Sequence, residues 1–176
     1  MKKIWFAVYA CLIVGSVLRA AEPGSTSGFR GEFLKQLDDV EKKCVSLAEA
    51  TPEAKYAWRP AEGVRSIGEV FVHIAGANYM FTRFIGAKMP EGLDPNMEKT
   101  VTKKSDITEL LKKSFAHARQ AVSNMPDADL EKQVKMFGNM VSERQALLVM
   151  ANHMHEHLGQ SIAYARTNGV VPPWSK

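Results

Sequence analysis

Residues 142–169 read SERQALLVMANHMHEHLGQSIAYARTNG, and this stretch decides the fold. Its apolar residues recur every three or four positions, which is the period of an amphipathic α-helix. Ser142 and Gln145 have the spacing of a capping box, and Gly169 is a typical C-terminal stop. The stretch therefore predicts a helix from about Ser142 to Asn168, with start and stop signals in its own residues.

The same periodicity occurs in three upstream segments of the 176-residue chain. It predicts helices over residues 29–50, 66–84 and 105–124, the second of which begins with a capping box. Four amphipathic helices with long connections predict an all-α four-helix bundle, which we expect to be of up-down type. The connection 86–102 is long enough to be a functional loop, and alternation over 133–138 predicts a short extended segment.

Two histidines of the last predicted helix are placed to share a metal ion. His153 and His157 are four residues apart, so both imidazoles point to the same side of the helix, and Gln160 follows on that side. His73 lies at the edge of the apolar face of the second helix, near the small Gly76. Three imidazoles suit a divalent ion of the zinc, nickel, copper or iron group and leave coordination positions open. This spacing indicates a reactive metal site near one end of the bundle.

A metal-free interpretation of these histidines stays open at this point, with one imidazole of the pair in the core and the other exposed. His155 should be solvated, and His117, among Lys and Arg, should lie on the surface. Cys44 has a core-facing position, where a free cysteine behaves as a small apolar side chain, and a thiolate ligand is the weaker alternative. Glu69 and Glu156 stand near predicted ligands, but a capping or surface role fits them better. Residues expected from position to shape a pocket are Trp58, Tyr79, Met80 and Tyr164.

The first 21 residues have the layout of a secretory signal peptide. A basic start precedes an apolar run over residues 4–18, and small residues follow, so we expect cleavage after Ala20 or Ala21 and export to the periplasm or the medium. The run is shorter than the ~20 residues of a spanning helix. An uncleaved membrane anchor is therefore the second choice, and lipidation at Cys11 is a weaker alternative.

The remaining chain predicts a flexible segment over residues 22–28 and one domain over residues 29–176. Three of the charges behind the formal net charge of +4 lie in the leader, so the mature chain carries +1. This charge gives no reason to expect a nucleic-acid partner. Cys44 is the one cysteine left after cleavage, so no internal disulfide can form.

The chain resembles the DinB-like (YfiT-like) superfamily of four-helix-bundle metal proteins. The resemblance is carried by Trp58-Arg-Pro60, by the capped segment Ser66-Ile-Gly-Glu-Val-Phe-Val-His73, and by His153-x3-His157-x2-Gln160. The ending Gly169-Val-Val-Pro-Pro-Trp174 is also similar, so the resemblance covers roughly residues 29–174. It implies that His73, His153 and His157 are ligands of a divalent metal ion, most often zinc or nickel.

The resemblance further implies a metal-dependent enzyme of hydrolase or thiol-transferase type, in which the metal activates water or a thiol. The predicted export departs from thiol chemistry, because low-molecular-weight thiols are chiefly cytosolic. The alternatives are a non-catalytic or stress-related extracytoplasmic metal-binding protein, with a fourth protein ligand in the site, and a metal-free helical interaction module. A small-molecule substrate, an orienting role for Gln160 and a homodimer are compatible with the sequence, which does not identify the substrate.

Overall fold

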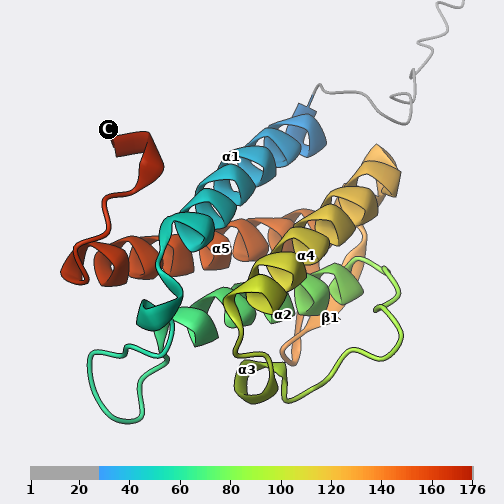
Figure 1. The fold of residues 1–176 in the computed structure, drawn as a ribbon. Helices are drawn as coiled ribbons and strands as arrows, with labels where there is room; N and C mark the ends of the chain where they lie inside the picture. Colours follow the sequence, from blue (N-terminus) through green and yellow to red (C-terminus); the bar gives the residue numbers. More distant parts are fainter. Residues whose placement is uncertain (1–27, 176) are drawn as a thin grey trace, which may run out of the picture.

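The computed structural model describes residues 28–175 and is dominated by four long helices (Figure 1). These are α1 (Gly28–Ala50), α2 (Ile67–Phe84), α4 (Lys104–Asn124) and α5 (Glu143–Thr167). The shorter elements are the 3-10 turns η1 (Glu53–Lys55), η2 (Asp127–Glu131) and η3 (Pro173–Ser175), the single-turn helix α3 (Met97–Thr100), and the strands β1 (Gln133–Met136) and β2 (Asn139–Ser142). All four predicted helices are confirmed, with each end within one residue of the prediction.

Each long helix turns an apolar face toward a common core. Leu37 of α1, Phe71 of α2, Phe115 of α4 and Met150 of α5 are essentially fully buried and belong to one contiguous cluster. Burying one such side chain contributes about 1.5–3 kcal/mol, so packing rather than helix propensity stabilises the bundle. Cys44 lies in the same cluster, and burial raises the pKa of its thiol to about 12.

The helices do not alternate in direction, so the predicted up-down arrangement is wrong. Contacts between α2 and α4 advance together along both helices: Asn78 is hydrogen-bonded to Ser114 at 3.1 Å, and Thr82 to His117 at 3.1 Å. The two helices therefore run parallel, and α1 and α5 run the other way (Figure 1). Because α4 starts beside the N-terminal end of α2, the connection 85–103 must run back along the whole of α2. The 18 residues of that helix span about 27 Å. Apolar periodicity encodes the buried face of a helix but not its direction.

The connection between α2 and α4 is organised around α3, a helical turn that was not among the predicted elements. The Asp94 carboxylate accepts a hydrogen bond from the backbone N–H of Asn96 at 2.8 Å, just before this turn. Met97 then packs over Gly76, where an added Cβ would lie 3.5 Å from the Met97 sulfur. This is ordinary van der Waals spacing, so α3 docks on α2 at a position three residues after His73 without requiring a glycine there.

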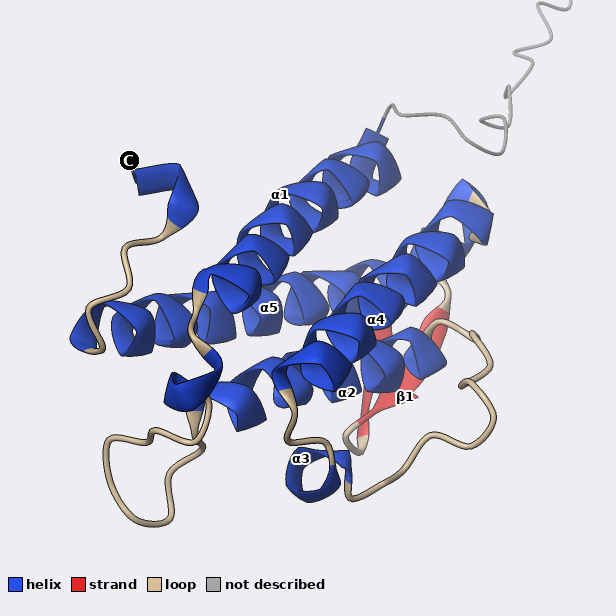
Figure 2. Ribbon diagram, viewed as in Figure 1, coloured by secondary structure: helices blue, strands red, loops and turns tan. Residues whose placement is uncertain are grey.

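The segment predicted to be extended is a two-stranded antiparallel hairpin (Figure 2). Its last pair is Met136 with Asn139, which leaves Phe137 and Gly138 as a two-residue turn. The hairpin packs against α2 and α5. It ends at Ser142, whose hydroxyl accepts a backbone hydrogen bond from the first turn of α5 and caps that helix.

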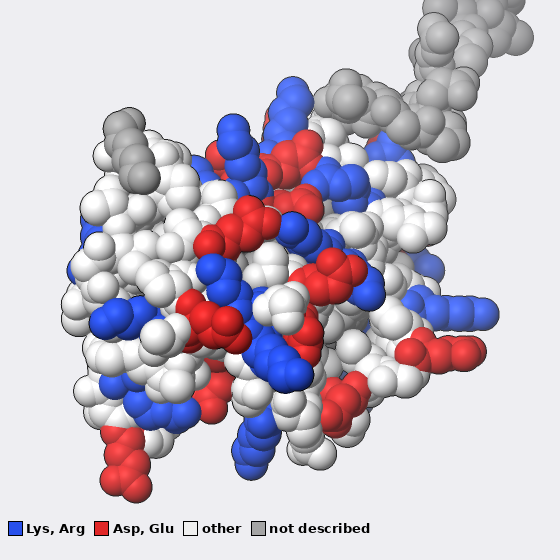
Figure 3. Space-filling model, in the orientation of Figure 1, with Lys and Arg blue, Asp and Glu red and all other residues white. Residues whose placement is uncertain are grey.

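Charged side chains of both signs are interspersed on the face shown in Figure 3. Arg119 of α4, for example, pairs with Asp38 and Glu41 of α1. Surface ion pairs contribute about 0–1 kcal/mol each, so they add little to the packing of these two helices. The absence of a nucleic-acid partner stays a prediction.

The N-terminal predictions are outside this description. The predicted signal peptide, residues 1–21, and nearly all of the segment 22–28 that was predicted to be flexible lie outside the described residues. Within residues 28–175, no helix combines the length and apolarity that a membrane crossing requires.

The buried Arg30 anchors the start of α1 by donating to the Met125 carbonyl and by pairing with Asp127 at 3.2 Å.

Candidate metal site

The three histidines singled out in the sequence meet between α2 and α5. His73 comes from α2, and His153 and His157 come from successive turns of α5. His73 Nε2 lies 3.1 Å from His153 Nε2, and one ring nitrogen from each residue lies within 4.8 Å of the other two. The ring centroids are between 4.4 and 5.0 Å apart. Packing of the two helices thus converts a separation of 80 residues into direct contact.

These distances and donor types fit a divalent metal ion. Two nitrogens that bind one zinc ion tetrahedrally at about 2.0–2.1 Å lie about 3.3 Å apart. The Nε2 atoms of His73 and His153, at 3.1 Å, are close to that separation. Among residues 28–175, no other histidine, cysteine, aspartate or glutamate belongs to the cluster. The triad would therefore occupy three coordination positions and leave others open.

His73 is supported from behind by Glu98 of α3. Its Nδ1 donates to Glu98 Oε1 at 2.7 Å, and Arg65 Nε donates to Glu98 Oε2 at 2.8 Å. A carboxylate acceptor fixes the proton on Nδ1 and leaves the Nε2 lone pair facing the other rings. Burial acts to raise the pKa of Glu98, but hydrogen bonds from Arg65 and His73 outweigh it and lower the pKa. Glu98 is therefore ionised at neutral pH and is a strong acceptor for His73.

His157 is supported by a second polar chain. Its Nδ1 donates to Gln160 Oε1 at 2.8 Å, and Gln160 Nε2 donates to the Tyr164 hydroxyl at 3.0 Å. The Tyr164 ring packs edge-on against Trp58, with centroids 5.4 Å apart. Gln160 thus positions His157, and its predicted role in orienting a group bound to the metal stays a prediction.

His153 has a drier environment than the other two. Its ring packs on Phe81 at 5.3 Å between centroids, and its Nδ1 is buried with no hydrogen-bond partner among the described residues. Desolvation, followed by the charges of His157 and His73, lowers the pKa of His153 to about 4. Desolvation also lowers the pKa of His73, against the opposing hydrogen bond to Glu98. These two rings are neutral at pH 7, as metal binding requires.

The other candidates of the sequence lie away from the cluster. Glu69 completes the capping box of α2, accepting from the Ser66 backbone N–H at 2.6 Å, while Glu156 and His155 are exposed. Cys44 is fully buried in the core and does not belong to the cluster. These positions agree with the capping, surface and core roles expected of them.

The prediction that His117 is a solvated surface residue is wrong. Its ring is partly buried, lies 5.1 Å from the Tyr79 ring and is hydrogen-bonded to Thr82. The prediction rested on the Lys and Arg residues near His117 on α4. Those neighbours do not reveal that Tyr79 and Thr82 of α2 pack against the ring. Tyr79 is buried against His117, whereas Tyr164 is linked to His157 through Gln160 and Trp58 packs on Tyr164. Met80 is only partly buried and packs against the core.

Two residues of the site, Glu98 and Arg65, were not identified in the sequence. Asp94-Pro95-Asn96 ahead of Glu98 is a helix-start pattern that could have indicated α3. No sequence signal places that turn beside His73, because the contact arises only when the long connection folds onto α2.

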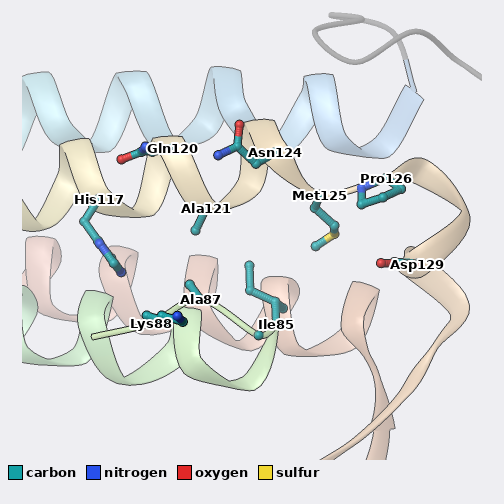
Figure 4. A pocket seen from close by; sticks show the side chains of 11 residues that line it. Ile85, Ala87, Lys88, His117, Gln120, Ala121, Asn124, Met125, Pro126 and Asp129 are labelled. Atoms are coloured by element: carbon teal, nitrogen blue, oxygen red, sulfur yellow. The ribbon is translucent and has the colours of Figure 1, made fainter. Parts of the chain in front are cut away.

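A separate cavity of about 440 Å³ lies where α2 and α4 end (Figure 4). His117, Gln120 and Asn124 line it from α4, and residues 85–88 line it from the connection after α2. Ile85 is 12 residues beyond His73, which is about 18 Å along a helix. The cavity is therefore not the surroundings of the triad.

Comparison with known proteins agrees with this architecture. Residues 36–161 match the family model of the DinB superfamily. A DinB-like protein from Bacillus cereus has a similar structure, with a TM-score of 0.73 and 21% sequence identity, covering 81% of this chain and 95% of that one. A DinB-like protein from Bacillus subtilis gives a TM-score of 0.65 at 22% identity, covering 80% of this chain and 93% of that one.

A third similar structure is YfiT from Bacillus subtilis, described as a probable metal-dependent hydrolase with an unusual four-helix bundle topology. Its TM-score is 0.63 at 16% identity, covering 81% of this chain and 89% of that one. No curated protein matches the chain. Since the family model matches more than half of the sequence, the chain belongs to the DinB superfamily.

Proposed function

We propose that this protein is a metal-dependent enzyme of hydrolase type, whose zinc or nickel ion is bound by His73, His153 and His157. The observation that carries the proposal is the make-up of the cluster: three imidazoles and, among residues 28–175, no fourth metal-binding side chain. Structural zinc sites are closed by four protein ligands, whereas catalytic sites keep a position open. The description of YfiT as a probable metal-dependent hydrolase supports the same class of reaction.

The ion would supply Lewis acidity, which lowers the pKa of a water molecule and polarises a substrate carbonyl or phosphoryl oxygen. The chain itself supplies positioning. Glu98 and Gln160 hold His73 and His157 in the tautomer with a free Nε2 lone pair. The Tyr164 hydroxyl accepts from Gln160 and so helps to fix the amide that supports His157.

Two other functions use the same ligands. A thiol transferase needs the same open position, but the predicted export favours water over a cytosolic thiol as the nucleophile. A metal-binding protein without catalytic activity is the second candidate. It is favoured by the linings of the cavities of about 440, 650, 390 and 410 Å³ among residues 28–175, none of which includes a histidine of the triad.

We also propose that the protein acts outside the cytoplasm, on the strength of its leader-like first 21 residues. Mass spectrometry of the protein isolated from its native host should find an N-terminus at Ala21 or Glu22. An intact Met1 terminus would contradict export by cleavage.

The metal proposal is tested by elemental analysis of the purified protein, His153→Ala and the control His155→Ala. We expect about one ion per chain in the parent and the control, and almost none in His153→Ala. Equal metal content in all three proteins would contradict the proposal.

The hydrolase proposal is tested by assaying the zinc-loaded and nickel-loaded proteins against p-nitrophenyl acetate, bis-p-nitrophenyl phosphate and an anilide. Turnover that disappears in His153→Ala but not in His155→Ala supports a hydrolase. Stoichiometric metal without turnover of any of these compounds favours the non-catalytic metal-binding protein.

A further inference from the structure

The β1–β2 hairpin ends in a turn that does not suit an aromatic residue. Phe137 and Gly138 have φ angles of 49° and 89°, so both central residues are left-handed. Two-residue turns of this kind strongly prefer Asn-Gly or Asp-Gly. Phe137 is the one non-glycine residue with positive φ in the described part of the chain, and a bulky side chain there is unfavourable. The requirements of the turn therefore do not explain this phenylalanine.

The Phe137 side chain lies at the end of an aromatic series that starts at the metal cluster. Its ring centroid is 5.2 Å from that of Phe84 and 6.1 Å from that of Phe81, both in edge-to-face geometry. Phe81 in turn lies 5.3 Å from the His153 ring. Despite these contacts, 61% of Phe137 is exposed. Most of its apolar surface is thus open to a ligand, separated from His153 by a single ring.

A purely structural role explains these features less well. Single exposed apolar residues are common and need no explanation by themselves. A bulky residue in a strained backbone conformation, however, is found mainly at sites of function. A side chain selected for packing alone would be buried, but Phe137 is mostly exposed. A side chain selected for the turn would be small or polar, but Phe137 is large and apolar.

We propose that Phe137 and Phe84 form an aromatic wall that selects the substrate, and that the substrate carries an aromatic or similarly flat apolar group. This inference rests on the proposed metal function and adds a substrate class to it. Aromatic rings pair favourably with centroids about 4.5–7 Å apart. The buried Phe81 ring lies between Phe137 and His153, so a substrate whose ring rests on Phe137 would reach the cluster by passing over Phe81. Phe137 is then a specificity-determining residue.

The test compares two probes that share one metal-binding group, acetohydroxamate and benzohydroxamate, by calorimetry on the zinc-loaded protein. Benzohydroxamate should bind more tightly, and Phe137→Asn should reduce this preference about 2- to 10-fold, the contribution of an aromatic pair. Phe137→Tyr should keep the preference. Since asparagine suits the turn, the thermal midpoint of Phe137→Asn should stay within about 4 °C of the parent.

The control Leu148→Gln removes another exposed apolar side chain, 48% exposed, from α5. An unchanged preference in Phe137→Asn, or an equal loss in Leu148→Gln, overturns the aromatic wall while leaving the metal centre intact.

If neither hydroxamate binds, the bound zinc has no coordination position open to them, which contradicts the proposed hydrolase site, and the wall is tested alone by NMR titration of the metal-free protein with benzyl alcohol. Chemical-shift changes around Phe137 and Phe84 that disappear in Phe137→Asn support the wall. Their absence in the parent protein overturns it.

Discussion

Glu98→Gln removes a negative charge from behind His73 while keeping the size of the side chain. In the structure, one carboxylate oxygen accepts from His73 Nδ1 at 2.7 Å and the other accepts from Arg65 Nε at 2.8 Å. The glutamine oxygen can replace one of these acceptors, but its NH2 group cannot replace the other. A neutral acceptor also makes His73 a less basic metal ligand.

We expect the zinc affinity of Glu98→Gln to fall about tenfold, the low end of the 10- to 100-fold loss typical when the partner of a ligating histidine is changed. This corresponds to about 1.4 kcal/mol of binding free energy. The free energy of unfolding of the metal-free protein should fall by no more than about 1 kcal/mol. The reason is exposure: the Arg65 and Glu98 side chains are 41% and 38% exposed, so their ion pair is screened by solvent.

The affinity is measured by competition with a chromophoric zinc chelator at pH 7. Glu156→Gln is the matched control, because Glu156 is an exposed carboxylate on α5 between His153 and His157. It removes the same charge near the cluster without touching a ligand. Equal zinc affinities in the two variants would refute the reasoning, since the effect would then be one of net charge and not of support for His73.

Burial and titration of individual groups set the other expected outcomes. In the metal-free protein the pKa of His153 is about 4, against 6.5 when unperturbed, so the unfolded chain takes up a proton that the folded chain does not. The free energy of unfolding should therefore decrease as the pH falls from about 6.5 toward 4, and urea titrations should show a smaller decrease in His153→Gln. Cys44, with a pKa of about 12, should react with a disulfide reagent at pH 8 only after unfolding, as followed by mass spectrometry of the labelled peptide. Gly68→Ala should lower the free energy of unfolding by about 1–3 kcal/mol, because the new Cβ would lie 3.2 Å from the buried Tyr56 ring. Gly159→Ala, with open space around the added methyl group, should raise it by about 0.5–1 kcal/mol; a loss of stability there would contradict this account.

Local signals predicted most of the secondary structure. The capping box at Ser66 and the stop at Gly169 mark helix ends that the structure confirms to within one residue. Burial of Cys44 followed from the same apolar period. These features depend on residues within one or two turns of each other, where the helical repeat leaves little freedom.

Non-local features were predicted less well. The parallel course of α2 and α4, the α3 turn and the cover that Tyr79 provides for His117 all depend on how distant segments meet. A connection as long as 85–103 can return the chain or let it continue at a similar entropic cost, so its length does not select the topology.

The sequence by itself determined that His153 and His157 share one face of a helix, because the 3.6-residue repeat sets their relative direction. It also determined that an apolar stripe beside His73 would be buried. Only the tertiary structure decided that the three rings meet, that Glu98 lies behind His73, and that Phe137 packs on Phe81, the ring next to His153. Those contacts join elements that share no local period, and they form when the apolar faces of α2 and α5, the α3 turn and the hairpin are buried together.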